Sequence, residues 1–266
     1  MDPWRRAIAF MRAVDEHAAE QVVPYRWGRA LINRRLNLVH DLNYLIADRL
    51  VGADALGLAA EADRIQGDAG LSHRRINVDD PAAADHLAPG FAAAGFKPER
   101  FVVMVHRRPP DQQVDTSQVR EVDWALLRPA RELEREQEPW ARTPGVVSQI
   151  LAKHELTASL IETRYFGVVI DGRVVSSCEL RTEGDVAQIE TVETLDAFRR
   201  RGLSRAVVSA ALEAARGYDF VFLVADANDW PREFYRRLGF EEVGIESRFL
   251  RLLSSSGSRD LPHVDG

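Results

Sequence analysis

A turn rich in arginine offers the clearest chemistry in this sequence. Three successive arginines, Arg199 to Arg201, precede Gly202, and a helical pattern begins at Leu203. The first turn of a helix leaves backbone N–H groups unpaired, and the helix dipole adds partial positive charge there. A tight entry that contains glycine can therefore bind a pyrophosphate, and the arginines strengthen the positive field. From these residues alone, a solvated basic turn that caps a helix is an equally good interpretation.

A second segment further along the chain favours the binding interpretation. It contains Asn228, then Phe234-Tyr235, then Gly239-Phe240. Together the two segments resemble the GNAT superfamily of acyl-coenzyme A dependent N-acyltransferases, and the resemblance covers residues 118–252. Each motif alone is weak, but their order and spacing make the pair specific.

The phosphate loop of that family has the pattern [Gln or Arg]-x-x-Gly-x-[Gly or Ala]. Here it is Arg199-x-x-Gly202-x-Ser204, so Ser204 departs from the pattern at its last position. The resemblance implies acetyl-CoA as cosubstrate, with backbone amides of residues 201–205 around its pyrophosphate and Asn228 on the pantetheine amide. The residues expected to bind it are Val192, Glu193, Thr194, Arg199, Arg200, Arg201, Gly202, Leu203, Ser204, Arg205, Asn228 and Tyr235.

The resemblance also assigns the acid and the base. Tyr235 would protonate the leaving thiolate, although a buried packing role is the default for such a residue without the motif. A base is needed because a protonated amine has no lone pair for attack. Alternation along the strand at 186–194 places Glu190 on one face with Val192 and Thr194. Glu190 is therefore the candidate base and Glu193 the weaker one, and a solvated or salt-bridged carboxylate is as good an interpretation of either.

The elements that position these residues form a regular series in the second half. Asp171-Gly172 between two apolar runs indicates a hairpin. We expect strands at 119–127, 165–170, 174–180, 186–194, 220–225 and 242–252, and helices at 130–137, 146–156, 203–216 and from Pro231 to a left-handed cap at Gly239. The order β-α-α-β-β-β-α-β-α-β predicts an α/β (α+β) domain with a mixed, largely antiparallel GNAT-type sheet flanked by helices.

The first half contains a degenerate repeat of the pattern in the second half. Gly52 precedes a helical pattern at 55–65, and Gly95-Phe96 follows another at 82–94, with strands expected at 38–46 and 101–106. Aligning Gly95-Phe96 on Gly239-Phe240 puts Phe91 at the position of Tyr235, and Asp54 would repel a phosphate. We therefore expect a tandem of two GNAT-like domains in which only the second binds CoA. An unrelated α/β extension is the alternative.

Breaks in the pattern suggest the boundaries. Two prolines in residues 107–113 interrupt both helix and strand, which divides the chain into residues 1–110, a catalytic domain at 118–252 and a flexible tail at 253–266. No apolar run approaches the ~18 to 20 residues of a membrane span, and the N-terminus has no signal-peptide core. We expect a cytoplasmic protein without a membrane partner.

Composition excludes several other classes. Of 266 residues 45% are hydrophobic and 29% are charged, as in an ordinary globular protein. The net charge of −6 disfavours nucleic acid as a partner. The single cysteine, Cys178, excludes a disulfide framework and is expected to pack in the core, and the histidines have no metal-ligand spacing.

These observations predict an acyl-CoA-dependent N-acyltransferase, acting on a primary amine by direct attack without a covalent enzyme intermediate. A non-catalytic CoA-binding regulatory protein on the same fold is the alternative. The sequence leaves open whether the acceptor is a small amine, an antibiotic, a peptide or a protein lysine, and a homodimer is compatible with it.

Overall fold

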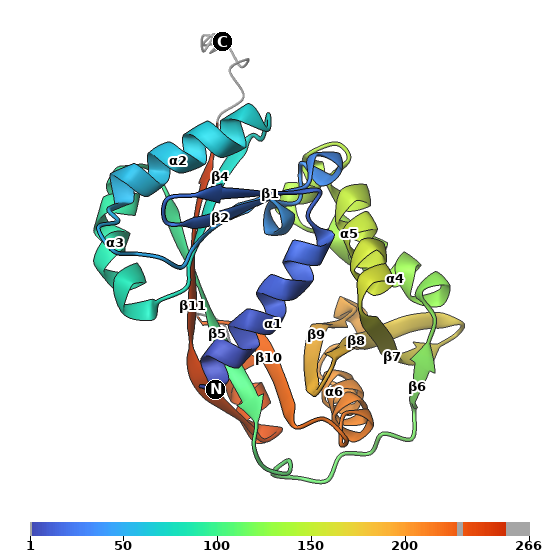
Figure 1. The fold of residues 1–266 in the computed structure, drawn as a ribbon. Helices are drawn as coiled ribbons and strands as arrows, with labels where there is room; N and C mark the ends of the chain where they lie inside the picture. The colour runs from blue at the N-terminus through green and yellow to red at the C-terminus, as the bar shows by residue number, and fades with distance from the viewer. Residues whose placement is uncertain (1, 228–230, 254–266) are drawn as a thin grey trace, which may run out of the picture.

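The last strands of the two halves of the chain lie side by side in the centre of one sheet. The computed structural model describes residues 2–227 and 231–253 (Figure 1). In that part of the chain, eleven strands form a single sheet in the order β1-β2-β3-β4-β11-β5-β10-β9-β8-β7-β6. The strands are β1 (Gln21–Tyr25), β2 (Gly28–Ile32), β3 (Tyr44–Ala47), β4 (His73–Val78), β5 (Lys97–His106), β6 (Val119–Val122), β7 (Glu162–Ile170), β8 (Arg173–Glu183), β9 (Val186–Thr194), β10 (Phe220–Asp226) and β11 (Phe240–Leu252).

Helices flank this sheet. They are α1 (Pro3–Ala18), α2 (Ala55–Asp68), α3 (Pro81–Ala93), α4 (Trp124–Glu136), α5 (Val146–Leu160), α6 (Leu203–Ala214) and α7 (Pro231–Arg237), with short 3-10 turns η1 (Arg34–Leu36), η2 (His40–Leu42), η3 (Pro139–Arg142) and η4 (Asp196–Phe198). Strand pairs are antiparallel except β3 with β4 and β9 with β10. The expected mixed, largely antiparallel sheet flanked by helices is confirmed.

The two halves repeat one order of elements. The first runs β1-β2-β3-α2-β4-α3-β5, and the second runs β7-β8-β9-α6-β10-α7-β11. In each, a helix links the third and fourth strands, which are parallel. The helices α3 and α7 both begin at a proline and end two residues before a left-handed glycine, Gly95 or Gly239. The repetition supports the tandem arrangement.

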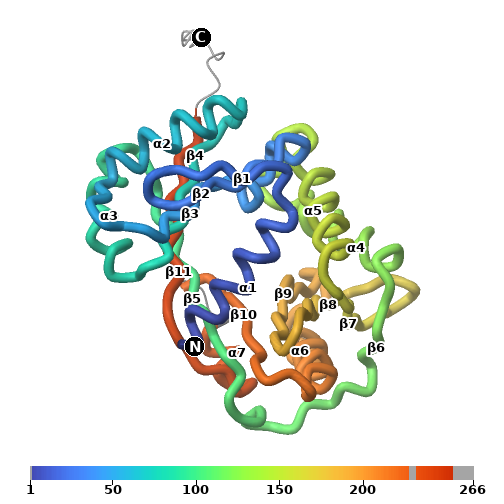
Figure 2. Tube along the Cα trace, in the orientation of Figure 1, coloured from blue at the N-terminus to red at the C-terminus, as the bar shows by residue number. Residues whose placement is uncertain are grey.

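The closing strands of the two halves are exchanged. β11 of the second half lies between β4 and β5 of the first, and β5 pairs with β10 of the second. Consequently Phe249 of β11 packs in the core of the first half, whereas Met104 of β5 packs in the core of the second. Figure 2 shows the blue-to-green and orange-to-red parts of the chain crossing at this point.

Two layers of helices cover opposite faces of the sheet. On β5, Val102 and Met104 belong to the core under α6 and α7, while Val103 and Val105 contact α1. Because successive strand residues point to opposite faces, α1 covers the face opposite α6. The N-terminal helix thus packs on β5 and on strands of the second half, where it contacts Phe220 and Phe222.

The expected series of elements in the second half is confirmed, with one substantial correction. The predicted strand at 119–127 ends at Val122, because the carboxylate of Asp123 accepts from the Leu126 N–H at 2.8 Å and caps a helix that begins at Trp124. The Asp171-Gly172 hairpin is present, with φ values of 51° and 76°.

The first half was less well predicted. Of the strand expected at 38–46 only Tyr44–Ala47 is extended, and a 3-10 turn precedes it. The helix α1 and the strands β1, β2 and β4 were not predicted. The break expected at 107–113 lies in the segment between β5 and β6, which contains no helix or strand. The division into separate domains stays a prediction.

A buried ion cluster joins α1 to the exchanged strand. Arg12 of α1 lies 2.8 Å from Glu246 of β11 and 2.7 Å from Asp79, and Arg248 lies 2.6 Å from Glu246. Burial alone would raise the pKa of Glu246, but Arg248 and Arg12 lower it to about 2. Glu246 is therefore an ionised carboxylate held between two guanidinium groups.

Replacing Glu246 by glutamine should lower the free energy of unfolding at pH 7 by about 3 kcal/mol, because removal of one partner leaves buried charges uncompensated. A carboxylate with a lowered pKa stabilises the fold above the ordinary glutamate pKa of ~4.3, and this contribution is lost as the pH falls toward 2. In urea unfolding, the difference between variant and parent should shrink over that range.

Glu242→Gln is the matched control. It removes a carboxylate from the same strand, but the ion pair of Glu242 with Arg232, 2.6 Å long, is solvent-exposed. Its loss should be below about 1 kcal/mol. Equal losses for the two variants at pH 7 would contradict the role given to Glu246.

Candidate functional site

A groove runs across the sheet beside the entry to α6. Its volume is about 710 Å³. It is lined by residues of α4, β9, the turn into α6 and α7: Glu134, Arg135, Glu138, Val192, Glu193, Thr194, Phe198, Arg199, Arg200, Gly202, Leu203, Ser204, Arg205, Phe234 and Tyr235. The structure thus brings together every residue expected to bind acetyl-CoA except Arg201 and Asn228. Asn228 lies outside the described residues.

The turn into α6 leaves backbone N–H groups without a backbone acceptor among the described residues. Gly202 is the N-cap residue of α6, has a φ of 78° and provides no side chain to accept from the helix. The first helical bond runs from the Ala206 N–H to the Gly202 carbonyl at 3.1 Å. The N–H groups of residues 203–205 therefore have no backbone acceptor in the described part of the chain. An anion at this helix entry would supply one.

The arginines of the turn differ in their surroundings. Arg199 pairs with Asp196 at 2.8 Å, and Arg201 donates to the Ala197 carbonyl at 3.0 Å and lies over the ring of Phe198. Arg200 and Arg205 line the groove, and neither has a carboxylate within 4.0 Å among the described residues. These two carry the positive charge available to a ligand.

Three hydroxyl groups fix the turn to the sheet. The Thr194 hydroxyl lies 2.8 Å from that of Ser204 and 2.7 Å from that of Ser176. Ser204, which departs from the family pattern, thus ties the start of α6 to the end of β9. The hydroxyl holds the turn into α6 in place.

The sheet opens where β9 and β10 diverge. Their parallel pairing ends at Ile189 opposite Leu223, although both strands continue. Beyond this point the edge of β9 that faces β10 has no strand partner, so main-chain groups around Val192 are open to the groove. An extended chain can lie along such an edge.

A bulge in β9 overturns the alternation expected from the sequence. Thr191 has a φ of 50°, and the pairing with β8 shifts between Glu190 and Glu193. The extra residue puts Glu190 and Glu193 on the same face, opposite Thr194, rather than placing Glu190 with Val192 and Thr194. Glu190 consequently points to the side of the sheet covered by α1 and α5.

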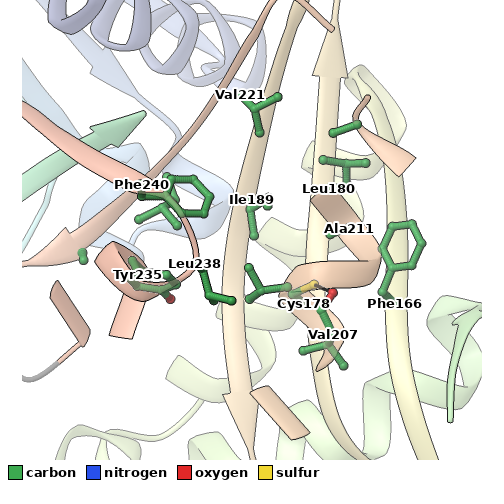
Figure 3. Packing of buried hydrophobic residues seen from close by; sticks show 14 of the residues in the cluster. Phe166, Cys178, Leu180, Ile189, Val207, Ala211, Val221, Tyr235, Leu238 and Phe240 are labelled. Carbon is green, nitrogen blue, oxygen red and sulfur yellow. Dashed lines mark hydrogen bonds between the residues drawn. The ribbon is translucent and has the colours of Figure 1, made fainter. Parts of the chain in front are cut away.

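Tyr235 lies at the other side of this opening. It is 9% exposed, lines the groove and packs edge-on against Phe240 with ring centroids 5.9 Å apart (Figure 3). Burial raises the pKa of its phenol, and the neighbouring Cys178 and Glu190 raise it further. Tyr235 therefore keeps its proton at neutral pH, which is the form that can donate.

Glu190 faces two adjoining cavities between the halves of the chain, and the smaller one is the more polar. The inner one measures about 200 Å³ and the outer one about 680 Å³, and both are lined by Glu190, Asp41, Arg75, Lys153 and Arg181. Thr191 lines the outer cavity, while the next residue, Val192, lines the groove. The bulge of β9 thus separates the groove from the cavities.

The two candidate carboxylates differ in their ion pairs, hydrogen bonds and pKa shifts. Glu193 forms ion pairs with Arg131 and Arg135, and although burial opposes it, these charges hold its pKa below the usual range. Glu190 accepts one hydrogen bond, from Gln188 at 2.6 Å, and burial raises its pKa. A group that must take up a proton is better matched by Glu190 than by Glu193.

Several cavity residues escaped the sequence analysis. Arg135 lines both the groove and the outer cavity. The Nδ1 atom of His154 lies 3.0 Å from the buried carboxylate of Glu179, and its ring stacks on Trp124. Asp15 of α1 lines the inner cavity. The composition could have drawn attention to Lys153, because only two of the 35 basic residues are lysines.

The corresponding turn of the first half is closed to an anion. Asp54 is the N-cap residue of α2 and accepts from the Gly57 N–H at 2.8 Å. Relative to the helix start it occupies the position of Gly202. Phe91 is fully buried and stacks on Phe249 at 4.3 Å. Both observations favour the prediction that this half binds no CoA.

Other candidates have structural roles. Cys178 is fully buried, and its thiol lies 3.3 Å from the Val207 carbonyl, which confirms the expected packing role. Within residues 2–227 and 231–253, no cluster of three His, Cys, Asp or Glu side chains is arranged to hold a metal ion. In the same residues no helix is long and apolar enough to cross a membrane.

Known proteins similar in sequence to this chain match its second half. Residues 127–240 match the acetyltransferase (GNAT) family. An uncharacterised N-acetyltransferase of Methanocaldococcus jannaschii is 37% identical over 89 residues, which are 32% of this chain and 38% of that protein. The chain thus matches well under half the length of this relative.

Solved structures share the fold over most of the chain. A conserved protein of unknown function from Staphylococcus epidermidis superposes with a TM-score of 0.65 at 13% identity, covering 88% of this chain and 94% of that one. A GCN5-related N-acetyltransferase from Kribbella flavida gives 0.59 at 15%, covering 94% and 95%. A tandem GNAT protein from the clavulanic acid biosynthesis pathway gives 0.52 at 17%, covering 78% and 71%. These structures show the fold alone, and the match to the GNAT family covers residues 127–240.

Replacing Gly202 by glutamate should abolish measurable CoA binding in calorimetry, because a carboxylate would stand at the N–H groups of the α6 entry. The unaltered protein should bind one CoA per chain. Gly202→Ala separates charge from strain, since a side chain at this positive φ costs roughly 1 kcal/mol by itself. It should weaken binding far less.

Gly217→Glu provides the matched charge control. This glycine lies just beyond the other end of α6, and its added Cβ would meet no atom within 4 Å. CoA affinity should change less than about twofold in this variant, whose charge is far from the proposed phosphate site. Equal affinity in Gly202→Glu and the parent, with an intact thermal unfolding transition, would refute the role of the turn.

Proposed function

We propose that this protein transfers an acyl group, most simply acetyl, from acetyl-CoA to a primary amine. Membership of residues 127–240 in the GNAT family supports acyl-CoA-dependent N-acetyltransferase activity in general. One observation carries the proposal for this chain. A groove with free helix N–H groups and a polar cavity lie on either side of the bulge of β9, with Tyr235 at the groove and Glu190 at the cavity.

The groove supplies a place for each part of the cosubstrate. The pyrophosphate would accept from the N–H groups at the start of α6, beside Arg200 and Arg205. The pantetheine arm would extend along the free edge of β9 toward the bulge, where Val192 offers main-chain groups. The thioester would then lie where the groove and the outer cavity adjoin.

The chemistry proceeds by direct attack. Glu190 takes a proton from the ammonium of the acceptor, directly or through water, and the freed nitrogen lone pair forms a bond to the thioester carbon. The carbon–sulfur bond breaks, and Tyr235 gives its proton to the departing thiolate. The products are an amide and free CoA. Main-chain donors near the bulge can stabilise the negative charge on the carbonyl oxygen.

The direct test is release of free thiol from acetyl-CoA in the presence of a panel of amines. Thiol release that depends on an amine, with a matching amide product in mass spectrometry, supports the proposal. CoA binding by the folded protein without amide formation from any amine would instead favour a regulatory CoA-binding protein.

Tyr235→Phe should lower kcat by ~10² to 10⁴-fold, the usual contribution of a general acid, because the ring remains and only the proton donor is lost. CoA affinity should change little. Tyr218→Phe makes the same chemical change on a partly buried tyrosine beyond α6 and should leave kcat within about twofold. A loss under about twofold in Tyr235→Phe would assign the proton to water.

Glu190→Gln should lower the rate most at pH values above the pKa of Glu190 and well below that of the amine, where free amine is scarce. Since burial raises the pKa of Glu190, the parent should lose activity at a higher pH than an ordinary glutamate would impose. Glu183→Gln, at the exposed end of β8, is the control. Identical pH–rate profiles for Glu190→Gln and the parent would transfer the base role to another cavity group such as His154.

A further inference from the structure

The inner cavity is lined mainly by charged and polar side chains of both halves. Most of its cations already have carboxylate partners. Arg12 pairs with Asp79 and Glu246, Arg75 lies 2.7 Å from Asp41, and Arg181 lies 2.6 Å from Glu179. These pairs form the walls and leave little charge for a ligand.

Three other charged groups of the cavity have fewer or weaker partners. Asp15 accepts a single hydrogen bond, from the Tyr44 hydroxyl at 2.5 Å, and Glu190 accepts one from Gln188. Neither has an ion-pair partner within 4.0 Å among the described residues. The ammonium of Lys153 makes no hydrogen bond there, and its one ion pair, 3.6 Å long, is with Asp41, a carboxylate that Arg75 and Arg248 also share.

The three groups require a ligand that carries both signs of charge. A carboxylate can accept several hydrogen bonds, and an ammonium can donate three. An amine alone would pair with Asp15 and Glu190 and leave Lys153 with only its share of the Asp41 carboxylate. A diamine would bring a second ammonium close to Lys153. The two positive charges would repel each other strongly, because the effective dielectric constant inside a protein is low. A molecule with one ammonium and one carboxylate complements all three groups.

The lining of the outer cavity indicates that the ligand also has an apolar part. Beyond the shared charged residues it is lined by large apolar side chains, among them Leu38, Val39, Ile150 and Leu250, with Trp140 at 39% exposure. The wider, apolar space therefore begins where the charged cavity ends. A ligand with its charged groups inside would place an apolar substituent here.

We infer that the acceptor is a small zwitterion of the amino-acid type with an apolar side chain. Its ammonium would lie between Asp15 and Glu190, its carboxylate at Lys153 and its side chain in the outer cavity. The inference rests on the proposed transferase function and names the substrate class of that site. It assigns Asp15 and Lys153, which the first half and α5 supply, to acceptor recognition.

The test compares acceptors that differ only in the carboxylate. Leucine, methionine and phenylalanine are each paired with the amine of the same skeleton, and 1,4-diaminobutane is added. Thiol release gives kcat/KM for each, and calorimetry without acetyl-CoA gives binding. The amino acid should exceed its paired amine by ~10 to 100-fold in kcat/KM, the usual effect of one charge-assisted contact.

Lys153→Met should reduce that ratio to within about threefold of one, because it removes the charge and keeps the length of the side chain. Lys97→Met removes the chain's other lysine, which is exposed at the start of β5, and should leave the ratio as in the parent. Asp15→Asn should raise KM for amino acid and amine alike. Thermal unfolding confirms that each variant is folded.

The outcomes separate the two proposals. If an amine without a carboxylate, or the diamine, serves as well as the amino acids, the inference is overturned while the transferase function stands. The same holds if Lys153→Met leaves the ratio unchanged. If no acceptor releases thiol, the transferase function fails, and calorimetric binding of the amino acids that is lost in Lys153→Met would still support the zwitterion site. Absence of binding at millimolar concentration would overturn it.

Discussion

The antiparallel pairing of β5 with β11 is the contact on which the rest of the molecule depends. It runs from Phe240 opposite His106 to Leu250 opposite Lys97, with one bulge near Gly244. Each strand closes the sheet of the half to which it does not belong in sequence. At one end of the pairing, Gly239 has a φ of 94° and approaches the Arg108 carbonyl so closely that a Cβ would lie 1.8 Å from it, so only glycine fits there.

The exchange explains why a half without its own phosphate turn is part of the site. Because β11 lies against β4, the polar positions of β4, Arg75 and Asn77, reach the cavity that Glu190 enters from the second half. The helix α1 crosses the same face and contributes Asp15. The first half has a carboxylate at Asp54 in place of an anion site, and its contribution is the wall of the cavity instead.

The sequence was most informative where local chemistry decides the structure. The turn at Gly202, the hairpin at Asp171-Gly172 and the cap at Gly239 each need a left-handed residue, and each was predicted. β4 could not be predicted, because its buried residues include His73, Arg74, Arg75 and Asn77, whose partners come from other elements. The prediction of the sheet face to which Glu190 points was wrong, because nothing in the residues around Thr191 indicates a bulge. The cavity depends on contacts between distant segments, which no local pattern encodes.

The position of β11 also sets the order in which the chain can fold during synthesis. The first half is made early, but the gap between β4 and β5 is filled by the strand that ends at Leu252. Until that strand leaves the ribosome, the facing edges of β4 and β5 carry unpaired backbone groups, which are prone to pair with other chains. Contacts between segments so far apart form slowly. The nascent first half therefore depends on its delayed partner, or on a chaperone, to avoid aggregation.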